Sequence, residues 1–395
     1  MALKIIFWMA VTLVAYTYAG YPLALTLRRS KKTRGANAAP FSNTNLSFSF
    51  DIPTVTLIIP AHNEERWIAR KIENTLALAY PRKKLEIVVA SDGSSDLTAE
   101  IVRGYEQRGV RLAAFASRLG KQEALNRLAP AAGGEIIVLT DANAMLAPDA
   151  LTALTAPFVD PRIACAIGRR ICIVQRASIA SPAESLYWRY ESWIKRAEFR
   201  WHSCLAATGQ LYAVRRNLFP HVERVGEDFF IPMKILATTG LRVAYVPEAV
   251  AAIPAAATLA GEYERKTRAH VSFLLTLPFL KELLIPAGNP VWWQFISHHV
   301  MRMLVPPAMA AALVTALLLA PAGHFYLAVL LLQILFYGLA LAGWRCALAN
   351  HRPKLFYFPF YFLFVQCALA EAWLRWPAGN YAYAWQPTER LPDAG

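Results

Sequence analysis

The stretch T-V-T-L-I-I-P-A-H-N-E-E (residues 54–65) decides the fold that we expect for this chain. Its first half is an apolar, β-branched run, which is typical of a strand that is buried on both faces of a sheet. Asn63 can then cap a helix whose first turn carries Glu64 and Glu65. An apolar strand followed at once by a helix is the repeating unit of a parallel sheet with helices on both faces.

The same alternation continues along the next part of the chain. Further strands are expected at residues 86–90, 110–115 and 136–139, and further helices at residues 97–107 and 121–128. Strands joined through helices run parallel, so their carboxyl ends meet at one edge of the sheet, where such sheets bind their ligands. We therefore expect an α/β domain, a mixed sheet with flanking helices, over residues 53–266.

Acidic turns follow three of these strands. They are P-A-H-N-E-E, S-D-G-S-S-D (residues 91–96) and T-D-A-N (residues 140–143). Like charges at one edge lower stability unless a ligand or cation uses them. Carboxylates can accept hydrogen bonds from a nucleoside and can hold Mg²⁺ or Mn²⁺ across a diphosphate. Each turn taken alone has a structural alternative, because Asp-Gly pairs are common in turns and Asp141 can cap the loop that follows it.

These turns, together with G-K-Q-E-A-L-N (residues 120–126), resemble the family 2 glycosyltransferases, which have the GT-A fold. The resemblance covers residues 54–268. It is closest in pattern to the membrane-embedded branch of cellulose, chitin, hyaluronan and poly-N-acetylglucosamine synthases. It implies a Rossmann-like mixed sheet and inverting transfer of a hexose or N-acetylhexosamine. The implied donor is a nucleotide diphosphate sugar, a UDP-sugar first of all, and the implied cofactor is Mg²⁺ or Mn²⁺.

The resemblance also implies roles for single residues. Those implied in binding the nucleotide sugar are Pro60, Ala61, Asn63, Glu64, Asp92, Lys121 and Asp141. Asp92 would contact the base and Lys121 would lie near the diphosphate. Asp141 and Asn143 would bind the metal. Asn143 stands where the family's D-x-D pattern has its second Asp, so it would offer an uncharged amide oxygen.

Further downstream, the resemblance implies an acceptor side. Its residues are Thr208, Gly209, Gln210, Glu227, Arg265 and Arg268, with Asp228 as the general base. An inverting transferase needs such a base, because the acceptor hydroxyl must lose its proton as it attacks the anomeric carbon. The alternative for the Glu-Asp pair is charge compensation at the start of the next helix. Arg268 could hold the departing diphosphate by a bidentate contact.

Processivity is the point at which the sequence departs from the family pattern. Processive members carry a Trp after the arginine, whereas Ala269 follows Arg268 here. The run R-K-T-R (residues 265–268), with S-H-H at residues 297–299, is similar to a bacterial exopolysaccharide subgroup. Aromatic residues between 187 and 201 could replace the missing acceptor platform. Alternatively, they belong to a helix at the membrane interface, where Trp and Tyr are enriched.

The remaining chain is that of a membrane protein. Hydrophobic residues make up 56% of the sequence, and residues 5–27 carry no charge. We expect an N-terminal transmembrane anchor (1–27), a basic polar linker (28–52), interfacial amphipathic helices (267–302), C-terminal transmembrane helices (303–376) and a tail (377–395). A signal peptide is the alternative for residues 5–27. The basic residues 28–34 predict that the catalytic domain is cytoplasmic, in a multi-pass protein of the inner (cytoplasmic) membrane.

Composition excludes other classes. Five cysteines without a C-x-x-C pair argue against a disulfide framework or a zinc site. The net charge of +14 indicates attraction to anionic lipids and a nucleotide rather than to nucleic acid. We therefore expect sugar transfer to a growing polysaccharide or lipid-linked saccharide in exopolysaccharide or envelope glycan synthesis. The alternatives are single-sugar transfer to a membrane lipid and an inactive nucleotide-sugar sensor or scaffold. A second copy or an export protein is a further possible partner.

Overall fold

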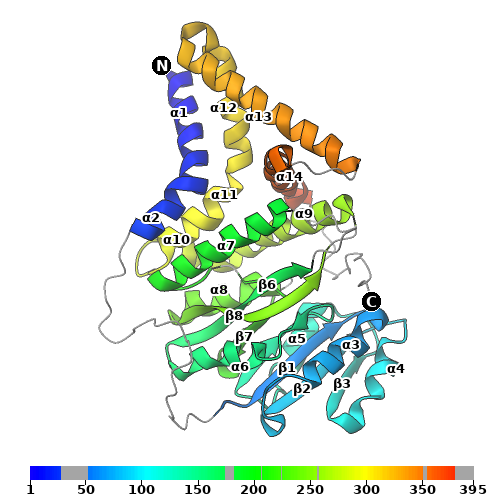
Figure 1. Cartoon of the computed structure of the whole chain (residues 1–395). Helices are drawn as coiled ribbons and strands as arrows, with labels where there is room; N and C mark the ends of the chain where they lie inside the picture. The colour runs from blue at the N-terminus through cyan, green and yellow to red at the C-terminus, as the bar shows by residue number, and fades with distance from the viewer. Residues whose placement is uncertain are drawn as a thin grey trace.

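The computed structural model describes residues 1–27, 52–173, 182–205, 207–223, 225–255, 258–349 and 354–378 (Figure 1). Residues 28–51 of the expected linker, which include the basic residues 28–34, lie outside these ranges. Residues 379–395 of the expected tail lie outside them too.

The expected parallel strands are present and adjacent. They are β1 (Val55–Ala61), β2 (Leu85–Asp92), β3 (Val110–Phe115) and β4 (Ile136–Leu139). Strand β1 pairs in parallel with both β2 and β4, and β2 pairs in parallel with β3. The prediction for this half of the sheet is confirmed, and β1 and β2 run one or two residues further than expected, into the polar turns.

The second half of the sheet is mixed and was not expected strand by strand. Its strands are β5 (Met145–Leu146), β6 (Ile163–Ile173), β7 (Tyr212–Arg215) and β8 (Arg242–Pro254). Among the residues that the structure describes, the sheet has eight strands in the order β3-β2-β1-β4-β7-β6-β8-β5. Strand β7 is antiparallel to both β4 and β6, whereas β6 and β8 are parallel. The carboxyl ends of β1, β2, β4, β6 and β8 therefore share one edge.

Two apolar cores lie on the two faces of this sheet. One face packs against α3 (Glu65–Leu76), α4 (Thr98–Arg103) and α6 (Ala150–Thr155). The other face packs against α5 (Lys121–Leu128) and α8 (Glu227–Thr239). Strand β1 shows the alternation, because Leu57 belongs to the first core and Ile58 to the second. Burial on both faces explains why these strands read as unbroken apolar runs.

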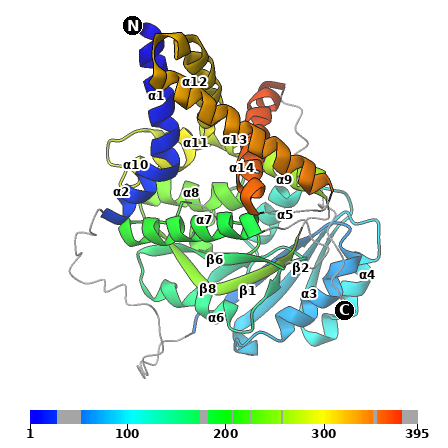
Figure 2. The same ribbon diagram turned by 45° about the horizontal axis from the view of Figure 1, so that its top comes forward.

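Within the described ranges, four helices are long and apolar enough to cross a membrane. They are residues Ala2–Leu27, Val305–Ala322, His324–Leu348 and Leu355–Arg375. The first consists of α1 (Ala2–Ala15), a π-helical turn and α2 (Tyr21–Leu27). The second consists of α12 (Val305–Leu319) and a short 3₁₀ turn. The third is α13 (His324–Leu348), and the fourth is most of α14 (Lys354–Arg375). Pro359 lies inside α14 and does not divide it. In both views α1, α12 and α13 project from one side of the domain (Figure 1, Figure 2).

Two amphipathic helices, α7 (Pro182–Trp201) and α9 (Leu259–Thr276), lie between the sheet and the projecting helices (Figure 2). Helix α9 runs without a break across residue 266, where we expected the domain to end. Its residues Val271 and Leu274 pack against Leu369 and Ala372 of α14. The domain is thus joined to the apolar helices by continuous packing and not only by its linkers.

A buried polar cluster also holds this junction. Glu198 of α7 accepts a hydrogen bond from the Tyr21 hydroxyl at 2.7 Å and lies 2.5 Å from Nδ1 of His298. Arg302 lies 2.7 Å from Glu191, which precedes Glu198 by about two turns on the same side of α7. Burial lowers the pKa of His298, but the Glu198 and Glu191 carboxylates outweigh burial and raise it above its usual value. Opposite charges therefore balance here, as buried charges require.

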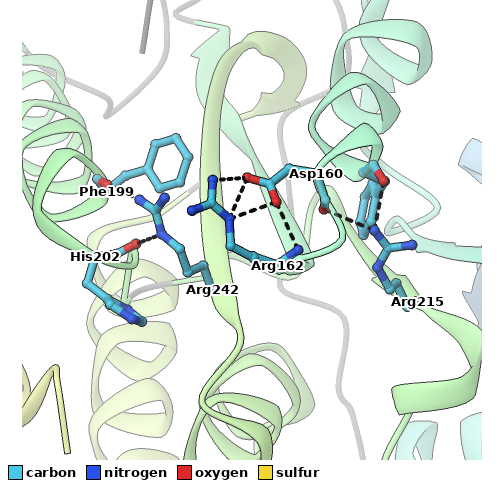
Figure 3. Close-up of polar contacts among 7 residues, drawn as sticks. Asp160, Arg162, Phe199, His202, Arg215 and Arg242 are labelled. Atoms are coloured by element: carbon cyan, nitrogen blue, oxygen red, sulfur yellow. Dashed lines mark hydrogen bonds and ion pairs between the residues drawn. The ribbon is translucent and has the colours of Figure 1, made fainter. Parts of the chain in front are cut away.

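The opposite edge of the sheet carries a separate polar cluster at the amino ends of β6 and β8 (Figure 3). Arg215, at the end of β7, donates to the carbonyl oxygens of Ile163 (2.8 Å), Phe158 (2.7 Å) and Asp160 (3.1 Å). Beside it, Arg162 forms an ion pair of 2.8 Å with the Asp160 carboxylate. Arg242 similarly binds the carbonyl of His202 at 2.7 Å. These contacts satisfy backbone carbonyl oxygens at the edge of the sheet opposite the polar turns.

Replacing Arg215 should affect the stability of the protein but not its ligand binding. Arg215→Met removes three hydrogen bonds from a charged donor to carbonyl oxygens, so the free energy of unfolding should fall by about 1–3 kcal/mol. The measurement is thermal unfolding of the purified full-length protein in detergent, with ligand binding measured in parallel. An unchanged melting temperature would contradict the role assigned to this cluster.

Candidate active site

The first two polar turns are bound to each other at the ends of β1 and β2. Asn63, which has a positive φ of 53°, accepts a hydrogen bond on Oδ1 from the Ser95 amide at 2.9 Å. The Glu64 amide donates to Oγ1 of Thr98 at 2.8 Å, and the Glu64 side chain is buried. Pro60 and Ala61 are the last residues of β1 and are buried too. Five predicted residues therefore lie together at the carboxyl ends of β1 and β2, and we call them the rim: Pro60, Ala61, Asn63, Glu64 and Asp92.

Asp92 has a structural task that the sequence did not indicate. Its carboxylate accepts hydrogen bonds from the backbone amides of Leu119 at 2.7 Å and Gly120 at 2.9 Å. These residues immediately precede α5, whose first residue is Lys121. Asp92 thus fixes the start of α5. Each carboxylate oxygen has a second lone pair and can accept another hydrogen bond. Contact between Asp92 and a nucleobase stays a prediction.

Lys121 joins the two acidic motifs at the centre of the site. Its Nζ lies 3.0 Å from Oδ1 of Asp141 and 2.6 Å from Oε1 of Glu227. The burial of Lys121 lowers its pKa, but the two carboxylates outweigh burial and hold the pKa above its usual value. The ammonium group is therefore charged, and it compensates carboxylates that would otherwise repel each other.

The predicted T-G-Q segment completes the cluster from a third side. The Gly209 amide donates to Oδ2 of Asp228 at 3.0 Å, and Nε2 of Gln210 donates to Oδ2 of Asp141 at 3.1 Å. A Cβ atom at Gly209 would lie 3.4 Å from Asp228 and 3.7 Å from both Asp141 and Lys121. Thr208 precedes this turn directly. Side chains from the turn after β4, from α5 and from α8 thus meet around one glycine.

The Asp228 carboxyl group has the properties of a base near neutral pH. Burial raises its pKa, the neighbouring Glu227 raises it further, and Lys121 opposes both, which leaves a pKa of about 7. One of its oxygens also accepts a hydrogen bond from the Phe229 amide at 2.9 Å, at the start of α8. Helix α8 begins at Glu227, so charge compensation at its first turn occurs together with the cluster and does not replace it.

Asn143 supplies an oxygen that the protein does not use. Its side chain is 6% exposed, and its Oδ1 is buried without a hydrogen-bond partner among the described residues. Asp141 and Asn143 together offer hard oxygen ligands, which suit Mg²⁺ or Mn²⁺. Within the described ranges no group of three or more His, Cys, Asp or Glu residues could hold a metal ion. A metal here would therefore need further ligands from a bound phosphate compound.

The two predicted arginines lie on α9. Arg265 is held in a bidentate ion pair by Glu262, at 2.6 and 2.8 Å. The same helix reaches the cluster through Ser272, because a Cβ atom on Gly226 would lie 2.2 Å from its Oγ. A leaving-group role for Arg265 and Arg268 stays a prediction.

Two buried polar residues beside the cluster were missed in the sequence. The Tyr212 hydroxyl, at the start of β7, is buried without a hydrogen-bond partner in the part of the chain that the structure describes. Lys71 of α3 is fully buried behind the T-D-A-N turn. Only the placement of a lysine between Ile68 and Ile72, on the apolar face of an expected helix, could have pointed to it.

Comparison with known proteins gives a consistent picture. Residues 56–222 match the family model described as Glycosyl transferase family 2. A β-monoglucosyldiacylglycerol synthase from Trichormus variabilis is 36% identical over 104 residues, which are 25% of this chain and 22% of that protein. A poly-β-1,6-N-acetyl-D-glucosamine synthase from Staphylococcus aureus is 25% identical over 226 residues, which are 55% of this chain and 54% of that protein. The chain thus spans about half the length of these relatives or less.

A solved structure shares the fold over nearly the whole chain. It is the mannosyltransferase PcManGT from Pyrobaculum calidifontis in complex with GDP-Man and Mn²⁺. The two are 23% identical with a TM-score of 0.67, and the similarity covers 95% of this chain and 100% of that one. The expected fold, a GT-A domain with apolar helices long enough to span a membrane, is confirmed.

Proposed function

Because this chain carries a family 2 glycosyltransferase domain, we propose that it transfers a sugar from a nucleotide diphosphate sugar, with inversion, to an acceptor at the membrane. One observation carries the proposal. Lys121, Asp141 and Asp228 meet around Gly209 at the carboxyl ends of the strands, where sheets of this kind bind ligands. This arrangement offers a cation for a diphosphate and a base for an acceptor.

The transfer follows from the positions of these groups. Asp228 takes the proton of the acceptor hydroxyl, and the oxygen attacks the anomeric carbon from the face opposite the diphosphate. The bond between that carbon and the diphosphate oxygen breaks, and the nucleoside diphosphate leaves with the electron pair. Lys121, which lies 3.0 Å from Asp141, compensates the negative charge that develops on the leaving group. The rim of Pro60, Ala61, Asn63, Glu64 and Asp92 would hold the nucleoside.

A divalent cation fits this site. Asp141 and the unused oxygen of Asn143 would hold it, and Mg²⁺ or Mn²⁺ would neutralise the diphosphate when bound. The PcManGT structure contains Mn²⁺, which supports a divalent cation without choosing between the two metals. Arg265 and Arg268 of α9 would steady the departing diphosphate from the other side.

The acceptor that we propose is a growing polysaccharide or a lipid-linked saccharide, on the cytoplasmic side of the inner membrane. The S. aureus relative is a polysaccharide synthase. A second candidate is single-sugar transfer to a membrane lipid, the reaction that the name of the T. variabilis relative indicates for that protein. One observation favours short products. Among the described residues of the three C-terminal candidate spans, Thr315, Gln333 and Gln366 are the only Ser, Thr, Asn or Gln side chains.

The role of the base predicts a loss of turnover without a loss of binding. Asp228→Asn keeps the shape of the side chain but removes its basicity, so the transfer rate should fall about 10²-fold or more. Donor binding by calorimetry should persist. In the wild type, kcat/KM should rise about tenfold per pH unit below pH 7 and level off above it, because only the ionised form of a carboxyl group with a pKa of about 7 accepts a proton. Near-normal rates in Asp228→Asn would assign the base to another residue.

Product length separates the two acceptor classes. Sugar hydroxyls are costly to bury without hydrogen-bond partners. A single copy with so few polar groups in its three C-terminal candidate spans should therefore make short products or single additions. The measurement is the size of the labelled product made by purified monomer in liposomes that contain the acceptor lipid. Long polymer that crosses the bilayer would contradict this expectation, unless a second copy or an export protein is present to complete a channel.

A further inference from the structure

A buried lysine lies directly behind the T-D-A-N turn. Lys71 of α3 is 0% exposed, although lysine is among the residues least often buried. Its Nζ donates to Oγ1 of Thr140 at 3.0 Å and to the carbonyl oxygen of Ala144. These two acceptors flank Asp141 and Asn143. One ammonium group therefore closes the turn that carries both expected metal ligands.

The same helix holds the next part of this segment. Asn74 lies about one turn further along α3 and uses both groups of its amide. Its Nδ2 donates to the carbonyl of Leu146 at 2.9 Å, and its Oδ1 accepts from the Leu146 amide at 2.8 Å. Helix α3 thus holds residues 140–146 at both ends, in addition to the pairing of Met145 and Leu146 with β8.

The lysine is also connected to the acceptor side. The Thr140 hydroxyl, which accepts from Lys71, donates to the carbonyl of Gln210 at 2.8 Å. The Gln210 side chain in turn donates to Asp141 at 3.1 Å. A short chain of hydrogen bonds therefore runs from Lys71 through Thr140 and Gln210 to the Asp141 carboxylate.

Stability alone does not explain a lysine at this place. Burial lowers the pKa of Lys71 to about 7, against the opposing effect of Asp141, which shows that the ammonium is disfavoured there. An apolar side chain of similar length would fill the same space without that cost. The contacts of Lys71, by contrast, all end on the turn with Asp141 and Asn143.

We propose that Lys71 is a positioning residue, which fixes the turn of residues 140–144 so that Asp141 and Asn143 present their oxygens to a metal-bound diphosphate. The inference rests on the proposed function and deepens it. Lys71 does not touch the donor. It acts through the backbone and through Thr140, as a support acts on the groups that bind a ligand.

The test compares binding with stability in the full-length protein in detergent. Lys71→Met should weaken the binding of UDP or GDP in the presence of Mn²⁺ by about tenfold, or about 1.4 kcal/mol, as measured by calorimetry. The melting temperature should fall less than in the control variant below, because the lost hydrogen bonds to Thr140 and Ala144 are offset by the removal of a buried charge. Arg215→Met is the matched control, because it removes a cation with backbone contacts at the opposite edge of the sheet. It should lower the melting temperature and leave nucleotide binding unchanged.

A second pair of variants covers the case in which Lys71→Met does not fold. Thr140→Val removes the hydroxyl that Lys71 contacts and should weaken nucleotide binding, whereas Thr140→Ser keeps the hydroxyl and should not. Unchanged binding in both Lys71→Met and Thr140→Val would overturn the inference. If wild-type protein binds neither UDP nor GDP with Mn²⁺, the proposed function fails first, and this inference fails with it.

Discussion

The ion pairs of Lys121 are the interaction on which the rest of the site depends. Asp141 follows β4 and Glu227 begins α8, and the ammonium lies 3.0 Å from the first and 2.6 Å from the second. Without it, the carboxyl groups of Asp141, Glu227 and Asp228 would repel each other at a cost in free energy. Asp92 keeps Lys121 in place by binding the backbone just before α5. The polar turns are thus a single unit in which each member fixes another.

The position of this unit relative to the apolar helices matters for the acceptor. Ser272 of α9 lies against Gly226, next to the proposed base, while Val271 and Leu274 of the same helix pack on α14. One helix therefore separates the base from the candidate spans. The buried charges of α7, with Glu198 against Tyr21 and His298, hold the domain in this relation to the N-terminal helix.

Sequence patterns predicted one half of the sheet better than the other. Strands β1 to β4 are buried on both faces and are separated by helices, so each is visible as an apolar run before a polar turn. Strand β7 is four residues long and antiparallel between two parallel neighbours, and no local pattern carries that pairing. Among the residues predicted for the site, Asp141, Lys121 and Asp228 could be named because each stands in a short local motif. Lys71 and the backbone contacts of Asp92 were missed because their partners lie distant in sequence.

The most direct test of the central claim is a structure of the full-length protein with a nucleoside diphosphate and Mn²⁺. The account predicts that the metal lies against the oxygens of Asp141 and Asn143. It also predicts that Lys121 turns towards the diphosphate and that Asp228 faces the open side of the site. A nucleotide bound at another edge of the sheet, with the Lys121–Asp141 pair of 3.0 Å unchanged, would contradict the account.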